Sequence, residues 1–236
     1  MKKWSVYSLL LVLPTLLFSQ CGFCVDLKPY KATYLLKWQG MHVGKSTHQV
    51  QQLGKHHFII ESISTPSLSF LPFESYEKSE FTIKKDKIEP KMYQYKTLDK
   101  GKKKEGTFRF DWNRKKLTHA SNTSMTEIKP LQDNLHDKIT YIIQLQKDLE
   151  RRHQPLSYSV IEPKGLKTYH FTRQGFEILK TPMGNINTLK LVHISDNKER
   201  RTELWLAKDF NYLLIKLRQI RKGKVTAEGL ITFIEQ

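Results

Sequence analysis

The stretch that decides the fold is residues 202–233, which read TELWLA, KDFNY, LLIKLRQI, RKGK and VTAEGLITF. Three runs with the two-residue alternation of β-strands are joined by two short turns, which predicts an antiparallel meander. In the second run, Leu213, Ile215 and Leu217 alternate with a set that contains Lys216 and Arg218. One face of this strand is therefore mostly apolar and the other carries cations, as in a sheet with one buried and one solvated face.

The pattern of the first run of the meander does not show which face of this strand is buried. Leu204 and Leu206 point to one face of the strand, whereas Trp205 points to the other. Trp205 therefore either packs on a helix or faces a ligand, and the local pattern does not choose between the two.

The rest of the chain repeats the rhythm of short strands and turns, with one exception. Apolar residues recur at helical spacing at positions 135, 139, 142, 145 and 149, which predicts a helix over 134–151 that is capped by Asp133 or Asn134. Many short strands with one apolar-striped helix predict a mainly β (α+β) fold. We expect a large curved antiparallel sheet, an unclosed β-barrel, wrapped around this helix.

The N-terminus predicts export. Lys2 and Lys3 precede an apolar run, Leu9–Phe18, in the layout of a secretory signal peptide. The run is shorter than the roughly 20 apolar residues that a membrane-spanning helix needs. We therefore expect a signal peptide over 1–24, one domain over 25–236 and a periplasmic location.

The two cysteines, Cys21 and Cys24, form a CGFC sequence at the end of this segment. A redox motif of this kind opens a helix after a strand, and here it follows a signal core instead. Ordinary signal cleavage is the simpler interpretation, and a lipid anchor on Cys21 is the alternative.

The charge of the chain narrows the class of partner. The formal net charge is +17 at pH 7. Nucleic acid is a common partner of such chains, but an exported protein seldom meets it, so we expect none. Anionic phosphate groups at an envelope surface are the expected partner class, and a generally basic, soluble surface explains the scattered lysines equally well.

No catalytic or metal-binding motif stands out. The chain has no nucleophile elbow, P-loop or dinucleotide fingerprint. His56 and His57 are adjacent, so on a strand they point to opposite faces and do not share one metal ion easily. Asp137 and Thr140 are explained by the start of the helix. We expect no enzyme activity, no metal and no cofactor.

A series of landmarks in a fixed order resembles a known family. The series contains Gly40 and Gly44, Glu89-Pro90, Phe108, Phe110 and Asp111, the DKITY sequence at 137–141, Phe171, the TPMG sequence at 181–184, Asn187-Thr188, and ELWLAKD at 203–209. It resembles the DUF3108 domain proteins of the bacterial envelope, with Thr140 where a serine is expected. The resemblance implies a periplasmic protein with a half-barrel fold similar to that of the lipoprotein carriers. It implies no established activity and no catalytic residues.

Two functions follow from this fold. A half-barrel with a helix on its concave side encloses an apolar space that suits a lipid or another amphiphile. The side chains expected to line or gate that space are Trp38, Phe70, Phe73, Phe108, Phe110, Leu204 and Trp205, although each is also of a type common in cores. The alternative is a structural or interaction module that binds anionic polymer through its basic surface, or a partner protein through an edge strand.

Overall fold

A computed structural model describes residues 27–67, 73–99, 101–122, 124–128, 131–196 and 198–236. Within these residues the chain forms sixteen strands, one α-helix and one short 3-10 helix. The elements in chain order are β1 (Tyr30–Trp38), β2 (Met41–Gly54), β3 (His57–Pro66), β4 (Phe73–Lys84), β5 (Lys87–Asp99), β6 (Lys102–Asp111), β7 (Lys116–Ser121), β8 (Met125–Ile128), β9 (Leu135–Asp137), α1 (Thr140–Glu150), β10 (Ser157–Glu162), β11 (Gly165–His170), β12 (Thr172–Thr181), β13 (Gly184–Ile194), β14 (Arg200–Ala207), η1 (Lys208–Phe210), β15 (Leu213–Arg221) and β16 (Lys224–Glu235).

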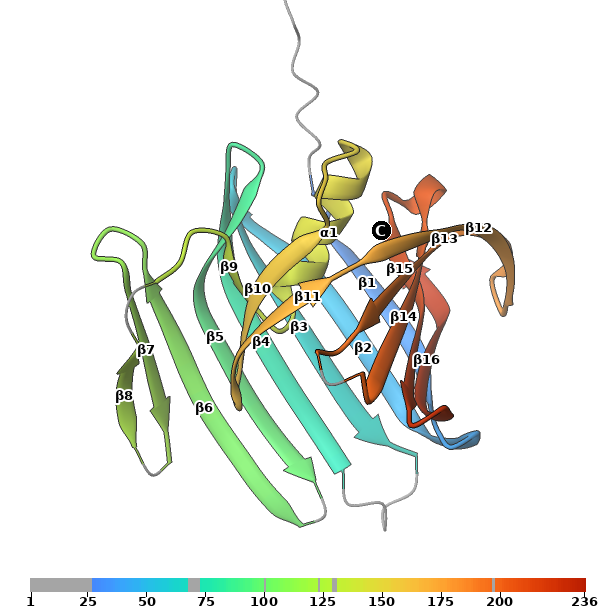
Figure 1. The fold of residues 1–236 in the computed structure, drawn as a ribbon, viewed down its shortest axis with the longest axis horizontal. Helices are drawn as coiled ribbons and strands as arrows, with labels where there is room; N and C mark the ends of the chain where they lie inside the picture. Colours follow the sequence, from blue (N-terminus) through green and yellow to red (C-terminus); the bar gives the residue numbers. More distant parts are fainter. Residues whose placement is uncertain (1–26, 68–72, 100, 123, 129–130, 197) are drawn as a thin grey trace, which may run out of the picture.

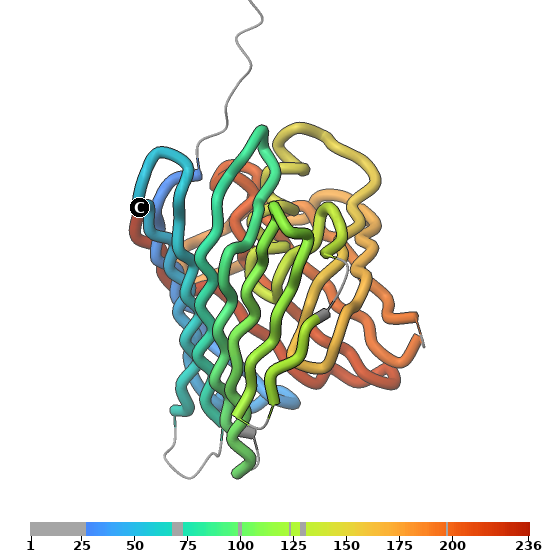
Figure 2. The backbone as a smooth tube through the Cα atoms, turned by 90° about the vertical axis from the view of Figure 1, so that its left-hand side faces the viewer, coloured from blue at the N-terminus to red at the C-terminus, as the bar shows by residue number. Residues whose placement is uncertain are grey.

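Thirteen of the strands form one antiparallel sheet in the order β12-β13-β14-β15-β16-β1-β2-β3-β4-β5-β6-β7-β8. The C-terminal strand β16 pairs with β1, so the predicted meander joins the N-terminal strands directly. Figures 1 and 2 show that this sheet is strongly curved and stays open between its two ends. The predicted fold class, an unclosed β-barrel around one main helix, is confirmed.

A second, three-stranded sheet lies with α1 on the concave side, where β9 pairs in parallel with β10 and β10 pairs with β11. The helix begins later than the sequence pattern predicts. Leu135 to Asp137 pair with Ser159 to Ile161 as a strand, and α1 starts at Thr140. Leu135 fits the helical spacing and a strand equally well, so a pairing partner distant in the sequence decides its state.

The helix joins two apolar clusters. Ile139, at the N-cap of the helix, and Ile143 pack with side chains from β2 to β7, whereas Tyr141, Leu145 and Leu149 pack with side chains from β13 to β15. The helix therefore fills the space between the two walls of the half-barrel, which Figure 1 shows on either side of it. Among the described residues, no helix has the length and apolar character that a membrane crossing requires.

Candidate functional site

The inner face of the large sheet has two halves with different chemistry. The half next to α1 and β9, here called the covered half, is apolar and buried; it contains Val50, Phe58, Ile60, Phe81, Phe108, Phe110, Leu117, Leu189, Leu191, Leu204 and Leu206. Residues further along the same strands, in phase with these side chains, form the open half. The open half contains Leu36, Ser46, Ser62, Ser64, Phe73, Ser75, Glu77, Tyr95, Thr97, His119 and Leu217.

Asp137 marks the boundary between the two halves. Its carboxylate accepts hydrogen bonds from the backbone N–H groups of Ile139 and Thr140, both at 2.9 Å, and from the Ser79 hydroxyl at 2.6 Å. It therefore caps α1 from two residues before the N-cap residue Ile139, in place of the predicted Asp133 or Asn134. Burial raises the pKa of Asp137 to about 6, against the opposing effect of these hydrogen bonds. The cap holds Lys138, the next residue, over the open half.

Lys138 joins a trio of hydrogen-bonded side chains on the floor of the open half. The Glu77 carboxylate accepts hydrogen bonds from the Tyr93 hydroxyl at 2.7 Å and from Lys138 Nζ at 2.6 Å. Glu77 and Tyr93 are buried, whereas 43% of the Lys138 side chain is exposed. Burial, followed by the charge of Glu77, raises the pKa of Tyr93, so its hydroxyl remains a hydrogen-bond donor.

A second trio of the same composition lies on the small sheet. The Glu162 carboxylate accepts hydrogen bonds from the Tyr169 hydroxyl and from Lys167 Nζ. Burial raises the pKa of Tyr141, and the negative charges of Glu162 and Glu77 both add to this increase. Tyr141, on α1, is therefore under the electrostatic influence of both carboxylates.

The arrangement of charges determines what this region can bind. Each carboxylate is paired with one lysine, so the two trios together carry no net charge. The tyrosine and lysine donors and the carboxylate acceptors suit a neutral group rich in hydroxyls, or a zwitterionic group, better than a phosphate. His48 lies beside Tyr34, with ring centroids 4.8 Å apart, and burial lowers its pKa to about 4, so it adds no charge at neutral pH.

An apolar strip crosses the open half beside the trios. Leu217, Gly229, Leu36 and Gly44 are successive cross-strand neighbours, and the Phe73 ring lies over Gly44. Leu36, Phe73 and Leu217 are each half-buried, whereas the apolar side chains of the covered half are fully packed. The strip is therefore the part of the inner face where apolar surface remains accessible between small residues.

The seven residues expected to line a ligand space lie in different surroundings. Phe108, Phe110 and Leu204 are packed in the apolar clusters at 7% exposure or less. Trp38 is 51% exposed at the end of β1, and Phe73 belongs to the apolar strip. Phe70 lies outside the described residues. Of the six members of this set that the structure describes, Phe73 is the one that contributes to the apolar strip of the open half.

Trp205, the seventh residue, lies on the opposite face of β14 from Leu204 and Leu206. Lys190, Lys216 and Arg218 stand over its ring at 4.7, 5.2 and 5.4 Å from the centroid, and its indole N–H donates to Glu177. Only 2% of Trp205 is exposed, because the long cationic side chains cover it. This resolves the open question of the meander: the two leucines face α1 and Trp205 faces outward.

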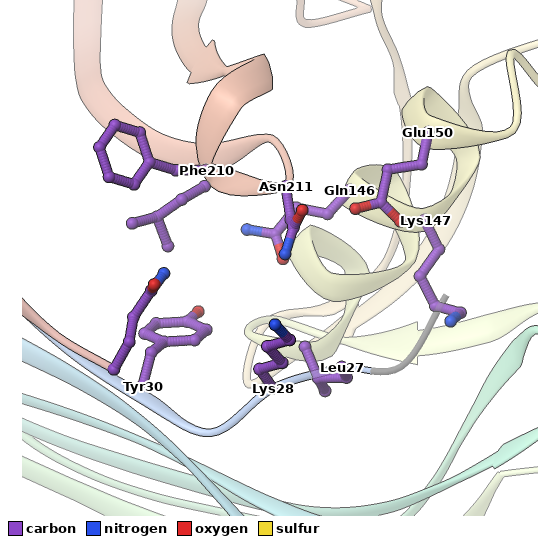
Figure 3. Close-up of a pocket in the computed structure, with 10 residues that line it drawn as sticks. Leu27, Lys28, Tyr30, Gln146, Lys147, Glu150, Phe210 and Asn211 are labelled. Atoms are coloured by element: carbon purple, nitrogen blue, oxygen red, sulfur yellow. The ribbon is translucent and has the colours of Figure 1, made fainter. Parts of the chain in front are cut away.

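A small cavity lies at the other end of α1, between the start of β1 and η1 (Figure 3). It has a volume of about 40 Å³ and is lined by Tyr30, Gln146 and Asn211, among others. The Gln146 Nε2 group is buried and has no hydrogen-bond partner among the described residues. This space suits ordered water rather than a lipid chain.

The trios themselves were not predicted from the sequence. Glu77 and Tyr93 lie on the paired strands β4 and β5, but Lys138 comes 61 residues after Glu77, so no local pattern connects all three. Glu162, Lys167 and Tyr169 lie on one hairpin. The closeness of a carboxylate, a lysine and a tyrosine in this part of the sequence is the signal from which the second trio could have been predicted. Among the described residues, no group of three His, Cys, Asp or Glu side chains converges as a metal site.

Comparison with known structures places the fold. A β-barrel-like DUF1849 protein from Brucella abortus superimposes with a TM-score of 0.57 at 9% identity, over 89% of this chain and 98% of that chain. A putative exported protein with a YmcC-like fold from Bacteroides fragilis reaches a TM-score of 0.34 at 7% identity, over 89% and 97% of the two chains. A search of curated proteins finds no match.

The family is shown by the sequence itself. The model of DUF3108, described as a protein of unknown function, matches residues 33–228, which is most of the chain. This range includes the helix and most of the meander, and it contains all the landmarks from Gly40 to Asp209 that carry the resemblance. The chain therefore belongs to the DUF3108 family.

Proposed function

We propose that this protein is an exported, periplasmic and non-enzymatic binding protein that holds one amphiphile on the open half of its inner face. The polar part of the amphiphile contacts the two Glu–Tyr–Lys trios, and its apolar part lies on the strip formed by Leu36, Phe73 and Leu217. Export is supported by the signal-peptide layout at Lys2 to Phe18.

The observation that carries the proposal is the juxtaposition of the half-buried apolar strip and the first trio, in which Glu77 and Tyr93 are buried and the Lys138 side chain is 43% exposed. On β4, the apolar Phe73 and the trio member Glu77 stand on one face, four residues apart. The rest of the apolar inner face is already filled by α1 and β9, so a ligand must use this part. A molecule with both a hydrogen-bonding head and an apolar chain satisfies the two surfaces together.

Native mass spectrometry of protein recovered from the exported fraction tests this proposal. We expect a bound amphiphile that dissociates under activation, and binding that changes little with salt because apolar burial is not screened. Repeated absence of any bound amphiphile, with none taken up when lipid extract is added, would show that the proposal is wrong.

Gly229 allows a blocking variant. A Cβ atom at this position would lie 3.6 Å from Leu36 Cδ2, an ordinary contact, and the backbone there is open to any residue. Gly229→Leu should fill the apolar strip and reduce occupancy by the amphiphile. Gly54→Leu is the matched control, because Gly54 is exposed at the end of β2 and its Cβ would meet only His57 at 3.8 Å. Equal occupancy in the two variants would contradict the proposed location.

Glu77→Gln tests the polar part separately. The amide keeps one oxygen acceptor but removes the charge that pairs with Lys138. We expect weaker retention of amphiphiles with hydroxylated or zwitterionic heads and unchanged retention of simple fatty alcohols. The same loss for both ligand types would place the head elsewhere.

A further inference from the structure

Two neighbouring hairpin ends form an exposed rim at one end of the half-barrel. The ends of β1–β2 and β15–β16 lie side by side at the lower right of Figure 1, where Gln39 N–H donates to the Thr226 carbonyl at 3.1 Å. Both turns are tight two-residue turns with positive φ at both central positions, Gln39-Gly40 and Lys222-Gly223. The rim residues are therefore held on short, rigid connections.

Apolar side chains project from this rim. Trp38 is 51% exposed and Met41 is 64% exposed, and the two are direct cross-strand neighbours. Val225, on the adjoining hairpin, is 37% exposed. Three large apolar side chains on rigid turns in water have an unfavourable hydration free energy that a partner surface would remove.

Cations surround these apolar side chains. Lys37, Lys222 and Lys224 have no carboxylate at ion-pair distance within the described part of the chain. Arg221 lies 3.9 Å from Glu199, and the Glu228 carboxylate is held by Lys216 and Arg218. The two hairpins also enclose a shallow hollow of about 730 Å³ that Arg221, Lys222 and Lys224 line on one side. The rim therefore has an excess of positive charge beside its apolar side chains.

Proteins that dock on anionic bilayers combine three kinds of side chain: tryptophan at the level of the head groups, apolar side chains such as methionine that reach deeper, and lysines around them. We infer that the rim formed by Trp38, Met41, Val225, Lys222 and Lys224 docks on a phospholipid surface that carries anionic head groups. This goes beyond the proposed function, since docking requires no molecule on the inner face. Leu36 of the apolar strip lies two residues before Trp38 on β1, so a docked rim also brings the strip close to the bilayer.

Co-sedimentation with vesicles tests the inference, using protein recovered from the exported fraction for every variant. We expect binding to vesicles of phosphatidylethanolamine with phosphatidylglycerol, weak binding to phosphatidylcholine alone, and a decrease as salt rises. The double variant Trp38→Ser/Met41→Ser should bind about tenfold more weakly, from the loss of apolar burial. Lys222→Ala/Lys224→Ala should weaken binding by a similar factor, and only on the anionic vesicles.

Leu53→Ser is the matched control, because Leu53 is 54% exposed at the β2–β3 connection, the opposite end of β2. It should bind as the parent protein does. Brominated lipids should quench the fluorescence of Trp38, and this quenching should disappear in Trp38→Ser, since Trp205 is buried and Trp112 donates to Pro90 at the opposite end of the strands.

Three results would overturn docking at this rim: equal binding by the rim variants and the parent protein, an equal loss in Leu53→Ser, or retention on protein partners with none on vesicles. Gly229→Leu keeps the rim intact and should dock normally. A failure of the amphiphile proposal and a failure of the docking inference are therefore distinguished by separate variants.

Discussion

The covered and open halves of the inner face are built on the same strands but have different roles in the molecule. On β3, Phe58 and Ile60 pack under α1 at 3% exposure each, whereas Ser62 and Ser64 continue the same face into the open half. On β4, Phe81 and Ser79 belong to the covered half, and Glu77 and Ser75 to the open half. Fully buried aliphatic and phenylalanine side chains thus stop where the helix and β9 stop covering these two strands.

The difference shows that one part of each strand stabilises the fold and another part of the same strand carries the groups that could bind a ligand. The covered half removes the larger apolar area from water and provides most of the free energy of folding. The open half contributes little to stability, so its residues can differ without unfolding the protein. Substitutions of the same kind in the two halves should therefore have unequal effects on stability.

The largest contrast is expected for leucine truncation. Leu204 is fully buried against α1, so Leu204→Ala removes packed methyl groups and leaves a cavity, which should lower the free energy of unfolding by about 3–4 kcal/mol. Leu36 is half-buried on the apolar strip, so Leu36→Ala should cost about 1 kcal/mol. Urea denaturation followed by circular dichroism measures both values. Equal losses would mean that the open half is packed as tightly as the covered half.

The boundary residue Asp137 should give the next largest effect. Asp137→Ala leaves the N–H groups of Ile139 and Thr140 and the Ser79 hydroxyl without their acceptor, which should cost about 2 kcal/mol. Asp133→Ala is the control, since Asp133 is exposed and pairs with Lys115 rather than with the helix. Thermal denaturation of the two variants compares them. A larger loss of stability in Asp133→Ala than in Asp137→Ala would mean that Asp133 caps the helix, as the sequence predicted.

These residues also show what the sequence could and could not predict. The strands and the existence of the helix follow from local periodicity, and the meander at 202–233 was placed correctly. The start of the helix depends on the pairing of β9 with β10, which lies more than 20 residues further along the chain. No local pattern reports such a contact.

The sequence predicted an apolar concave face, whereas the open half has serines, Glu77 and Thr97 beside its apolar strip. The sequence suggested an apolar concavity lined by Phe108, Phe110 and Leu204, but these residues pack against other apolar side chains of the protein. Which large apolar residues are already covered depends on the position of α1, and the sequence does not give that position. The burial of Trp205 could not be predicted for the same reason. It depends on three cationic side chains that lie on the neighbouring strands β13 and β15, on the same face of the sheet.

The pH dependence of stability provides a finer comparison across the boundary. The folded-state pKa of Asp137 is raised from 3.8 to about 6, so its contribution favours the fold at pH 4 and is lost as pH rises through 6. The folded-state pKa of His48 is lowered from 6.5 to about 4, so its contribution is present above pH 6.5 and is lost as pH falls towards 4. The two effects oppose each other over the same interval.

Single variants should separate them. Relative to the parent protein between pH 4 and 6.5, Asp137→Asn should gain stability towards high pH and His48→Gln should gain stability towards low pH. Each change should be on the order of 1–2 kcal/mol across the interval. Urea denaturation at a series of pH values measures the slopes. If both variants changed the slope in the same direction, the assignment of the two groups would be wrong.

The smallest and best-matched contrast uses serine in both halves. Ser79 is fully buried and donates to Asp137, so Ser79→Ala leaves a buried carboxylate oxygen without its donor and should cost about 1–2 kcal/mol. Ser64 is half-buried and donates at 3.0 Å to the hydroxyl of the buried Ser46, an uncharged acceptor, so Ser64→Ala should cost less than about 1 kcal/mol. The same atom is deleted from neighbouring strands of one face, so the ratio of the two losses in thermal denaturation measures how far water reaches into the half-barrel. A loss in Ser64→Ala as large as that in Ser79→Ala would mean that the open half is dry, and an amphiphile would then have to displace protein side chains to bind there.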